Sequence, residues 1–301
     1  MPCYSPVRAY RARYTNVSGK RPLVFNKNDG YEDLAVDIPC GKCIGCKLEK
    51  SRQWAVRCMH EAKMHNTSCF ITLTYDNDNL PEGGSLAPSH ITKFFKRMRK
   101  AGIAFRYFQC GEYGDSGCRP HHHACIFGYD FPDRILYKIE GDCEYYISEE
   151  LSRLWPYGFC LIGNLTFQSA AYVSRYVTKK ITGDIALAHY GQKVPEYATM
   201  SRRPGIGAKY FDKFRSDFVD KGQCILKVDN KYIASALPKY YINRYDDYLI
   251  SNPNDRGRWI SLKASRKKHI PDLTTDDLLY KEYIKHDKVD KRLKRRYEDG
   301  A

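Results

Sequence analysis

The stretch that most constrains the fold runs from Arg119 to Gly128 and carries three consecutive histidines. The residues after the histidines are apolar and β-prone, and Gly and Ser precede the stretch, so the pattern predicts a turn that enters a strand. The segment from Ala104 to Glu112 predicts a second strand, and residues 113–119 predict the loop that joins them. The fold therefore has to accommodate this hairpin.

Side chains alternate between the two faces of a strand, which places His121 and His123 on one face and His122 on the other. The two outer imidazoles are about 6.6 Å apart along the strand and can converge on one divalent cation. Glu112 on the partner strand can offer a carboxylate to the same ion, whereas Gln109 faces the opposite side of a regular strand. Two imidazoles and a carboxylate suit Mn²⁺ or Mg²⁺ bound to a phosphate oxygen. The alternative is an ordinary hairpin, because a His-x-His pattern alone is common.

The segments around the hairpin alternate between strand and helix patterns. In chain order they predict a helix (47–65), a strand (69–75), a helix (88–102), the hairpin, a short helix (149–155), a strand (159–165) and a helix (168–180). This order predicts an α+β fold in which helices cover an antiparallel-rich central sheet of the split βαβ kind. A polar insertion separates the hairpin from residue 149.

Composition divides the 301 residues into three parts. We expect a Cys-rich segment with a basic helix over 1–66, the sheet core over 67–185, and a basic region with DNA contacts over 186–301. In the last part, the amides of the basic turn Ser201–Gly207 either hold a phosphate or belong to an ordinary surface loop. The charge-rich helices over 263–299 present either a solvated face or a nucleic-acid arm.

A second motif is a Cys-x-x-Cys-x-x-Cys run. It consists of Cys40, Cys43 and Cys46. This spacing lets thiolates meet one zinc ion tetrahedrally, so we expect a structural zinc site. Cys3 is the first choice for the fourth ligand, and Cys58 or His60 are the alternatives. An iron–sulfur cluster also fits the spacing, and free thiols are the remaining possibility.

The 12 cysteines are too few for a secreted disulfide scaffold, so a reducing cytoplasm is expected. The N-terminus lacks the regions of a signal peptide, and no apolar run reaches the length of a bilayer span. The chain has 50 Lys and Arg against 35 Asp and Glu, a net charge of +15. This excess favours a polyanionic partner, nucleic acid before membrane, although a merely basic protein has the same balance. The 25 tyrosines and 13 phenylalanines offer rings for stacking on unpaired bases.

Three pairs of tyrosines have the i, i+4 spacing of one helical face. They are Tyr10/Tyr14, Tyr172/Tyr176 and Tyr241/Tyr245. Spacing singles out none of them, because a chain with 25 tyrosines produces such pairs by chance. We expect only Tyr172/Tyr176 to lie on a well-patterned helix, with Lys179 and Lys180 about one turn further along. A neighbouring ammonium favours the phenolate, which is a nucleophile for strand cleavage beside a metal-bound phosphate.

Together, these motifs resemble those of the HUH endonucleases that initiate rolling-circle replication. The matching elements are Phe70–Tyr75, the Arg-Pro-His-His-His of 119–123 and the Tyr-x-x-x-Tyr-x-x-Lys of 172–179. Met-Pro-Cys at the start, Pro-Cys-Gly-Lys-Cys-x-x-Cys and Ser-Arg-Arg-Pro-Gly-Ile-Gly are similar to the initiators of single-stranded DNA phages of the microvirus group, gokushovirus branch. The similarity covers the chain up to the region of residue 210. One departure is His122, where the family usually has a bulky hydrophobic residue.

The resemblance implies a metal-dependent endonuclease and strand transferase with two tyrosines. It assigns the catalytic Mg²⁺ or Mn²⁺ to His121, His123 and, as a third ligand, Glu112, and the nucleophiles to Tyr172 and Tyr176. Lys179 would steady the phosphate or a tyrosinate. Attack on a backbone phosphate would form a 5′-phosphotyrosyl link and free a 3′-OH, and a later attack would rejoin the ends.

The resemblance also implies partners: single-stranded DNA, the replication origin, and the host replication helicase and polymerase, all in the cytoplasm of a bacterial host. Two other classes compete with this interpretation. A relaxase or single-strand transposase shares the fold and chemistry, but the two-tyrosine helix and the Cys-rich start disfavour the transposase. A non-enzymatic, zinc-stabilised single-strand binder would also be basic and aromatic, but it would not need a metal hairpin opposite a tyrosine helix.

Overall fold

The computed structural model describes residues 3–16, 19, 21–114, 118–179, 181, 185–228, 231–255 and 274–297. Contacts divide the chain into two compact units: one comprises residues 1–50 and 270–301, and the other comprises residues 51–269. The helix α1 (Ile44–Ala62) runs from the first unit into the second. The domain boundaries expected at residues 66 and 185 stay a prediction.

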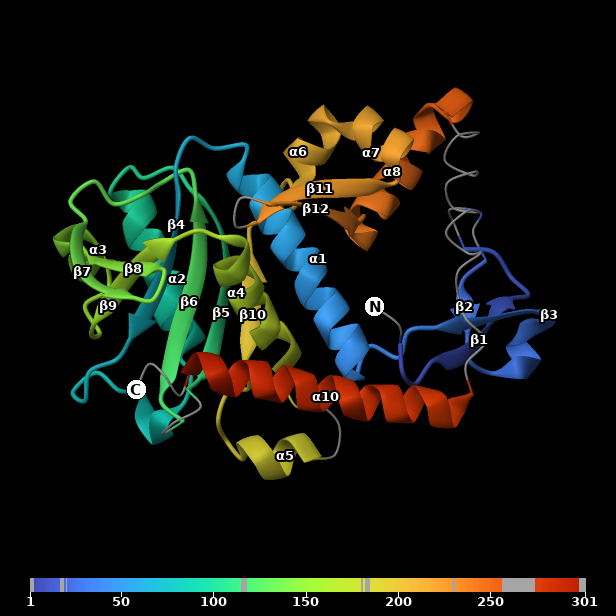
Figure 1. The fold of residues 1–301 in the computed structure, drawn as a ribbon, viewed down its shortest axis with the longest axis horizontal. Coiled ribbons are helices and arrows are strands. Elements are labelled where there is room, and N and C mark those ends of the chain that lie inside the picture. The colour runs from blue at the N-terminus through green and yellow to red at the C-terminus, as the bar shows by residue number, and fades with distance from the viewer. Residues whose placement is uncertain are drawn as a thin grey trace. The chain divides into compact units, whose positions relative to one another are not determined.

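The larger unit is built on a seven-stranded sheet (Figure 1). Its strands are β4 (Ser68–Thr74), β5 (Arg106–Tyr113), β6 (Pro120–Phe127), β7 (Ile135–Glu140), β8 (Cys143–Ile147), β9 (Cys160–Asn164) and β10 (Tyr197–Met200). They lie in the order β10-β5-β6-β4-β9-β8-β7, and every neighbouring pair is antiparallel. The four inner strands β5-β6-β4-β9 have the split βαβ order, which confirms the predicted fold class.

Helices cover both faces of this sheet because its strands alternate apolar side chains between the faces. On one face, α2 (Pro88–Lys100) and α3 (Glu149–Leu154) pack with Ile71, Leu73 and Ile126. Proline at the start of α2 preorganises the first turn, and its buried stripe is the predicted one of Ile91, Phe94, Phe95 and Met98. On the other face, α1 and α4 (Phe167–Lys179) pack with the side chains of Phe108 and Phe127.

Both ends of the sheet extend beyond what the sequence pattern indicates. The polar insertion forms the hairpin β7–β8, all of whose β7 residues are exposed. At the other end, β10 pairs with β5, with Thr199 opposite Gln109, although 90 positions separate them in the chain. Short helices connect these parts: the 3₁₀ turn Glu82–Gly84 precedes α2, and α5 (Ile185–Tyr190) precedes β10.

The remaining described elements of the larger unit form a second hydrophobic cluster around α1. It consists of α6 (Ala208–Lys213), α7 (Arg215–Lys221), the hairpin of β11 (Gln223–Val228) and β12 (Lys231–Ala236), α8 (Lys239–Ser251) and the 3₁₀ turn Pro253–Asp255. The cluster buries Val56, Phe211 and Tyr241 together. His60 lies in it as well, with its ring stacked on Tyr210.

The smaller unit contains a three-stranded antiparallel sheet in the order β2-β1-β3. The strands are β1 (Val7–Ala12), β2 (Leu23–Val24) and β3 (Gly30–Ile38), with a 3₁₀ turn at Lys27–Asp29. The start of α1 and the long helix α10 (Thr275–Tyr297) belong to the same unit. Residues 263–273, 298 and 299 of the charge-rich segment predicted over 263–299 lie outside the described residues. No helix among those described is long and apolar enough to cross a membrane.

Candidate metal and tyrosine site

Three potential metal ligands meet at the loop end of the β5–β6 hairpin. Glu112 pairs in register with His121, and Cys110 pairs with His123, so the carboxylate and both imidazoles lie on one face. Oε1 of Glu112 lies 2.7 Å from Nε2 of His121 and 2.8 Å from Nε2 of His123. The three ligand atoms all lie within 4.8 Å of one another. The structure therefore brings together the three residues that the sequence selects as metal ligands.

The outer nitrogen of each imidazole is fixed by a second partner. Nδ1 of His121 lies 3.0 Å from the carbonyl oxygen of Arg119, and because a carbonyl only accepts, this nitrogen carries the proton. Nδ1 of His123 lies 2.9 Å from the hydroxyl of Thr72, its register partner on β4. In the neutral tautomer of His121 the Nε2 lone pair faces Glu112, so either a proton or a cation has to lie between them.

Glu112 is almost completely buried and remains charged. Burial is the strongest single influence and raises the pKa of this carboxyl, but the hydrogen bonds and charges of His121 and His123 together outweigh it, and the net pKa is below the usual value. Its second oxygen, Oε2, is buried and has no hydrogen-bond partner among the described residues. A buried anionic oxygen without a partner is costly, so the site has the charge and the free acceptor that a divalent cation would satisfy.

His122 points to the opposite face, as strand alternation predicts. Its ring is fully buried near Trp155, and Nε2 lies 3.3 Å from the hydroxyl of Tyr75. Burial lowers the pKa of His122 to about 3, so the ring is neutral. Gln109 also faces away from the ligands: its amide donates to the Thr199 hydroxyl on β10 at 2.6 Å.

The helix α4 places the first of the two predicted tyrosines beside the ligands. The helix starts with reciprocal bonds between Thr166 and Ser169, which cap its first turn, and it packs over β5, β6 and β10. The Tyr172 hydroxyl donates to Oε1 of Glu112 at 3.3 Å. The ring stands edge-on to His123 at 5.0 Å, and the Arg175 guanidinium carbon lies 5.7 Å from its centroid.

Tyr176 and Lys179 follow Tyr172 on the same helix, one and two turns further along. Their side chains, and residue 180, lie outside the described part of the chain. The expected roles of Tyr176, Lys179 and Lys180 therefore stay predictions. The backbone of α4 places residues 172 and 176 on one helical face.

The other two tyrosine pairs have different settings. Tyr10 lies in β1, a strand, so the Tyr10/Tyr14 pair is not helical. Tyr241 and Tyr245 lie on α8, a helix with a buried face, so the expectation that only Tyr172/Tyr176 lies on a well-patterned helix is wrong. Both rings are buried in the hydrophobic cluster around α1, and burial raises the pKa of Tyr241 well above its usual value. This pair serves packing.

The sequence did not single out three residues that support the site. Thr72 and the Arg119 carbonyl orient the imidazoles, and Phe70 stacks on His123 with ring centroids 5.6 Å apart. Thr72 lies opposite His123, so a prediction of the β4–β6 register would have found it. The Arg119 side chain donates to the Tyr75 carbonyl oxygen at 2.8 Å and to Asn77, which anchors the loop that leads into β6.

The basic turn Ser201–Gly207 is held to the core by a buried carboxylate. Glu61 accepts the Gly207 amide at 2.6 Å and the guanidinium of Arg106 at 2.5 Å. Gly207 is itself buried. The amide at this end of the turn is therefore occupied by a protein carboxylate, which favours the structural interpretation of the turn over a phosphate site.

Comparison with known proteins identifies the family of this chain. Residues 68–181, which contain every residue discussed for the ligand site, match the family described as replication-associated protein ORF2/G2P. Replication-associated protein ORF2 of Spiroplasma virus 4 is 32% identical over 296 residues, which cover 92% of this chain and 89% of that protein. Replication-associated protein VP4 of Bdellovibrio phage phiMH2K is 30% identical over 281 residues, covering 89% and 82%.

A third relative, replication-associated protein ORF4 of Chlamydia phage 1, is 30% identical over 213 residues, covering 66% of this chain and 52% of that protein. No solved structure matches the chain. The chain belongs to the family of replication-associated proteins ORF2/G2P, and this confirms the resemblance to the replication proteins of these small phages.

Proposed function

We propose that the protein initiates phage DNA replication by nicking single-stranded or origin DNA with a tyrosine, and later rejoins the ends. The observation that carries this proposal is the convergence of two imidazoles and a tyrosine hydroxyl on one carboxylate oxygen. Family membership supports the role in replication. The geometry adds a chemical reason, because a nucleophile and a set of cation ligands lie within hydrogen-bond reach of each other.

The residues fit a divalent cation of the Mg²⁺ or Mn²⁺ class. His121, His123 and Glu112 would hold it, and only three protein ligands leave positions open for oxygen atoms of a substrate. When bound, such an ion neutralises charge on a phosphate. Thr72 and the Arg119 carbonyl keep the imidazoles turned toward the shared position.

In the proposed reaction, the oxygen of Tyr172 or Tyr176 attacks a backbone phosphorus in line. A bond forms between the tyrosine oxygen and phosphorus, and the bond from phosphorus to the 3′ oxygen breaks. The phenol proton leaves the tyrosine, and the departing 3′ oxygen takes up a proton. The products are a 5′-phosphotyrosyl link and a 3′-OH from which a polymerase of the bacterial host can extend. Attack of a 3′-OH on the link reverses the step and joins the ends.

The setting of Tyr172 supports its role as a nucleophile. Its hydroxyl points to Glu112, which keeps the oxygen beside the cation position, and the Arg175 guanidinium adds positive charge next to the ring. Lys179 would contact the phosphate or a tyrosinate. DNA binding would draw on the net charge of +15, with the host helicase and polymerase as later partners in the host cytoplasm.

An adduct experiment tests the proposal. The full-length protein is incubated with labelled single-stranded DNA carrying the cognate origin and Mn²⁺, and covalent products are separated under denaturing conditions. Tyr172→Phe and Tyr176→Phe are each expected to retain part of the cleavage or joining, whereas the double variant forms no adduct and still binds DNA. Phenylalanine keeps the packing of the ring and removes only the nucleophilic oxygen.

Tyr241→Phe is the matched control, because it makes the same change on another helix without touching the ligands. It should form as much adduct as the wild type. Mass spectrometry should place the nucleotide on the peptide that contains Tyr172 and Tyr176. An adduct on a serine or on Tyr241, or DNA binding without any adduct in the wild type, would favour a different enzyme or a non-enzymatic single-strand binder.

A further inference from the structure

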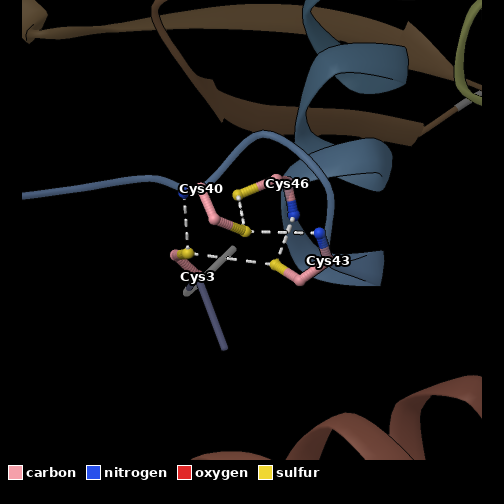
Figure 2. Close-up of side chains that lie close together, drawn as sticks. All are labelled: Cys3, Cys40, Cys43 and Cys46. Atoms are coloured by element: carbon pink, nitrogen blue, oxygen red, sulfur yellow. Dashed lines mark hydrogen bonds between the residues drawn. The ribbon is translucent and has the colours of Figure 1, made fainter. Parts of the chain in front are cut away.

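A cluster of four cysteines lies in the smaller unit, in which no part of the candidate nicking site is found among the described residues. Cys3 precedes β1, Cys40 follows β3, Cys43 directly precedes α1, and Cys46 lies in the first turn of α1. The four Sγ atoms all lie within 4.8 Å of one another, and Figure 2 shows them pointing toward a common centre. Chain segments 37 positions apart are thus brought together through sulfur.

Two sulfur–sulfur distances match those expected around a single tetrahedral ion. Sγ of Cys40 lies 4.0 Å from Sγ of Cys46, and Sγ of Cys43 lies 3.9 Å from Sγ of Cys3. A zinc ion with bonds of about 2.3 Å to four sulfurs sets them about 3.8 Å apart. A disulfide needs about 2.0 Å. Both measured pairs therefore lie close to the edge length of a zinc tetrahedron and far from a disulfide bond.

The backbone around the cluster is arranged for thiolates. Amides donate to three of the sulfurs at 3.2 to 3.4 Å: Cys40 to Cys3, Lys42 and Cys43 to Cys40, and Tyr4 and Cys46 to Cys43. Gly41 has a φ of +76°, a left-handed conformation that turns two amides toward Cys40. Amide donors aimed at sulfur stabilise negative charge, which is the state in which cysteine binds a metal.

The alternatives considered for the fourth ligand lie elsewhere. Cys58 is buried in the hydrophobic core between α1 and the sheet, and Nδ1 of His60 lies 3.0 Å from the Tyr241 hydroxyl. Cys3 alone among these candidates faces the run formed by Cys40, Cys43 and Cys46.

The smaller unit has a small hydrophobic core that a bound metal ion would supplement. Among its described residues, the buried hydrophobic side chains are Tyr4, Ala9, Ala12 and Cys43. So small a core contributes little free energy of folding, and small units of this kind are commonly stabilised by a structural metal. The Ile44 amide, one residue after Cys43, donates to the Glu282 carboxylate of α10 at 3.2 Å, so the cluster borders the other elements of its unit.

We propose that Cys3, Cys40, Cys43 and Cys46 bind one structural zinc ion. Four protein ligands close the coordination sphere, so the ion has no open position for a substrate. The ion joins the N-terminal segment, the end of β3 and the first turn of α1. Its role is separate from the cation of the His121/His123 site and does not depend on the proposed nicking activity.

Metal analysis of the full-length protein tests the proposal. The wild type, purified without chelator, is expected to carry one zinc per chain at the cluster. Cys43→Ser and Cys3→Ser should lose this zinc, whereas Cys143→Ser, which changes an exposed cysteine in β8, should keep it. A His121→Ala/His123→Ala double variant should also keep it, which separates the cluster from the other site.

Because a cysteine variant can misfold, a second measurement uses the wild type alone. Replacing the bound ion with Co²⁺ should give the visible absorption of tetrahedral tetrathiolate cobalt. Strong chelation should lower the melting temperature. Iron in place of zinc, a disulfide within the cluster, a stable wild type without metal, or a cobalt-loaded wild type that lacks the tetrathiolate absorption would each overturn the proposal.

Discussion

Three adjacent histidines on β6 have the same chemistry and different surroundings. His121 and His123 share a carboxylate partner, whereas His122 is buried against Tyr75 on the opposite face. We expect His121→Ala or His123→Ala to abolish cleavage and to leave the fold and DNA binding intact, because phosphate contacts supply the affinity and the metal serves the chemistry. Cleavage assays and binding titrations on the same protein samples measure both effects.

His122→Phe is the control for that prediction. Cleavage should stay near the wild-type rate, because this side chain does not reach the ligand face, while overpacking of the core should lower the free energy of unfolding by about 1–3 kcal/mol. Loss of cleavage in His122→Phe together with activity in His121→Ala would show that the ligands are assigned to the wrong imidazoles.

Thr72 is expected to act through His123. Its hydroxyl lies 2.9 Å from Nδ1 and fixes the ring so that Nε2 faces Glu112. Thr72→Val keeps the shape and removes the hydroxyl, so metal affinity or the cleavage rate should fall about 10- to 100-fold. Titration of cleavage against Mn²⁺ concentration measures the effect.

Thr72→Ser should restore most of that loss, because it returns the hydroxyl. Thr74→Val is the matched control on the same strand: its hydroxyl donates to the Phe159 carbonyl oxygen at 2.8 Å and not to an imidazole. Equal losses of metal affinity or cleavage rate in Thr72→Val and Thr74→Val would show that any valine in β4 has this effect, and that the hydroxyl of Thr72 has no special role.

Among the elements, those with strong local patterns were predictable. The helix α2 has an amphipathic stripe, and the β5–β6 hairpin has a clear alternation of side chains. Their positions and the side chains that they bury therefore follow from neighbouring residues. Glu112, His121 and His123 could be found together for the same reason, because a hairpin fixes its own register.

The elements that sequence reasoning missed lack a strong local pattern. The strand β10 has four residues and gains its place only through β5, and every residue of β7 is exposed, so it has no apolar alternation. The Tyr241/Tyr245 pair was misjudged for another reason. Tyrosine has an apolar ring and a polar hydroxyl, so its spacing does not distinguish a buried helix face from an exposed one.

The connection between α6 and the core gives a test at the level of elements. Gly207 caps α6 with a φ of +78°, and a Cβ there would lie 2.3 Å from the Tyr241 hydroxyl and 3.2 Å from the Arg57 carbonyl oxygen. Gly207→Ala combines a left-handed backbone with a clash, so the free energy of unfolding should fall by about 2–4 kcal/mol. Urea unfolding measures the change.

Gly191→Ala is the matched control for Gly207→Ala. Its φ is +55°, but a Cβ at this position meets nothing within 4 Å. The free energy of unfolding should therefore fall only by the cost of the left-handed backbone, about 1 kcal/mol. Equal losses in the two variants would mean that the packing of Gly207 against Tyr241 does not matter to stability.

At the scale of the whole molecule, the charge of +15 and the buried ligand site are expected to contribute to different steps. Lysine and arginine side chains that neutralise phosphates release counterions from DNA, so the logarithm of the association constant should fall linearly with the logarithm of salt concentration. The slope for single strands is about −0.7 for each neutralised phosphate. Fluorescence titration of a labelled single strand over a series of salt concentrations measures this slope.

The same titration with His123→Ala separates binding from chemistry. His123 is buried and contacts Glu112, so its loss should leave the slope unchanged while cleavage disappears. In the wild type, moderate salt should weaken DNA binding. At saturating DNA and Mn²⁺, the rate of the covalent step should not change. The reason is that the metal ligands and Tyr172 lie in a partly enclosed site, where salt screens electrostatic interactions little. If His123→Ala lowered the slope as much as it lowered cleavage, the metal would be a main source of DNA affinity, and the separation of roles would be wrong.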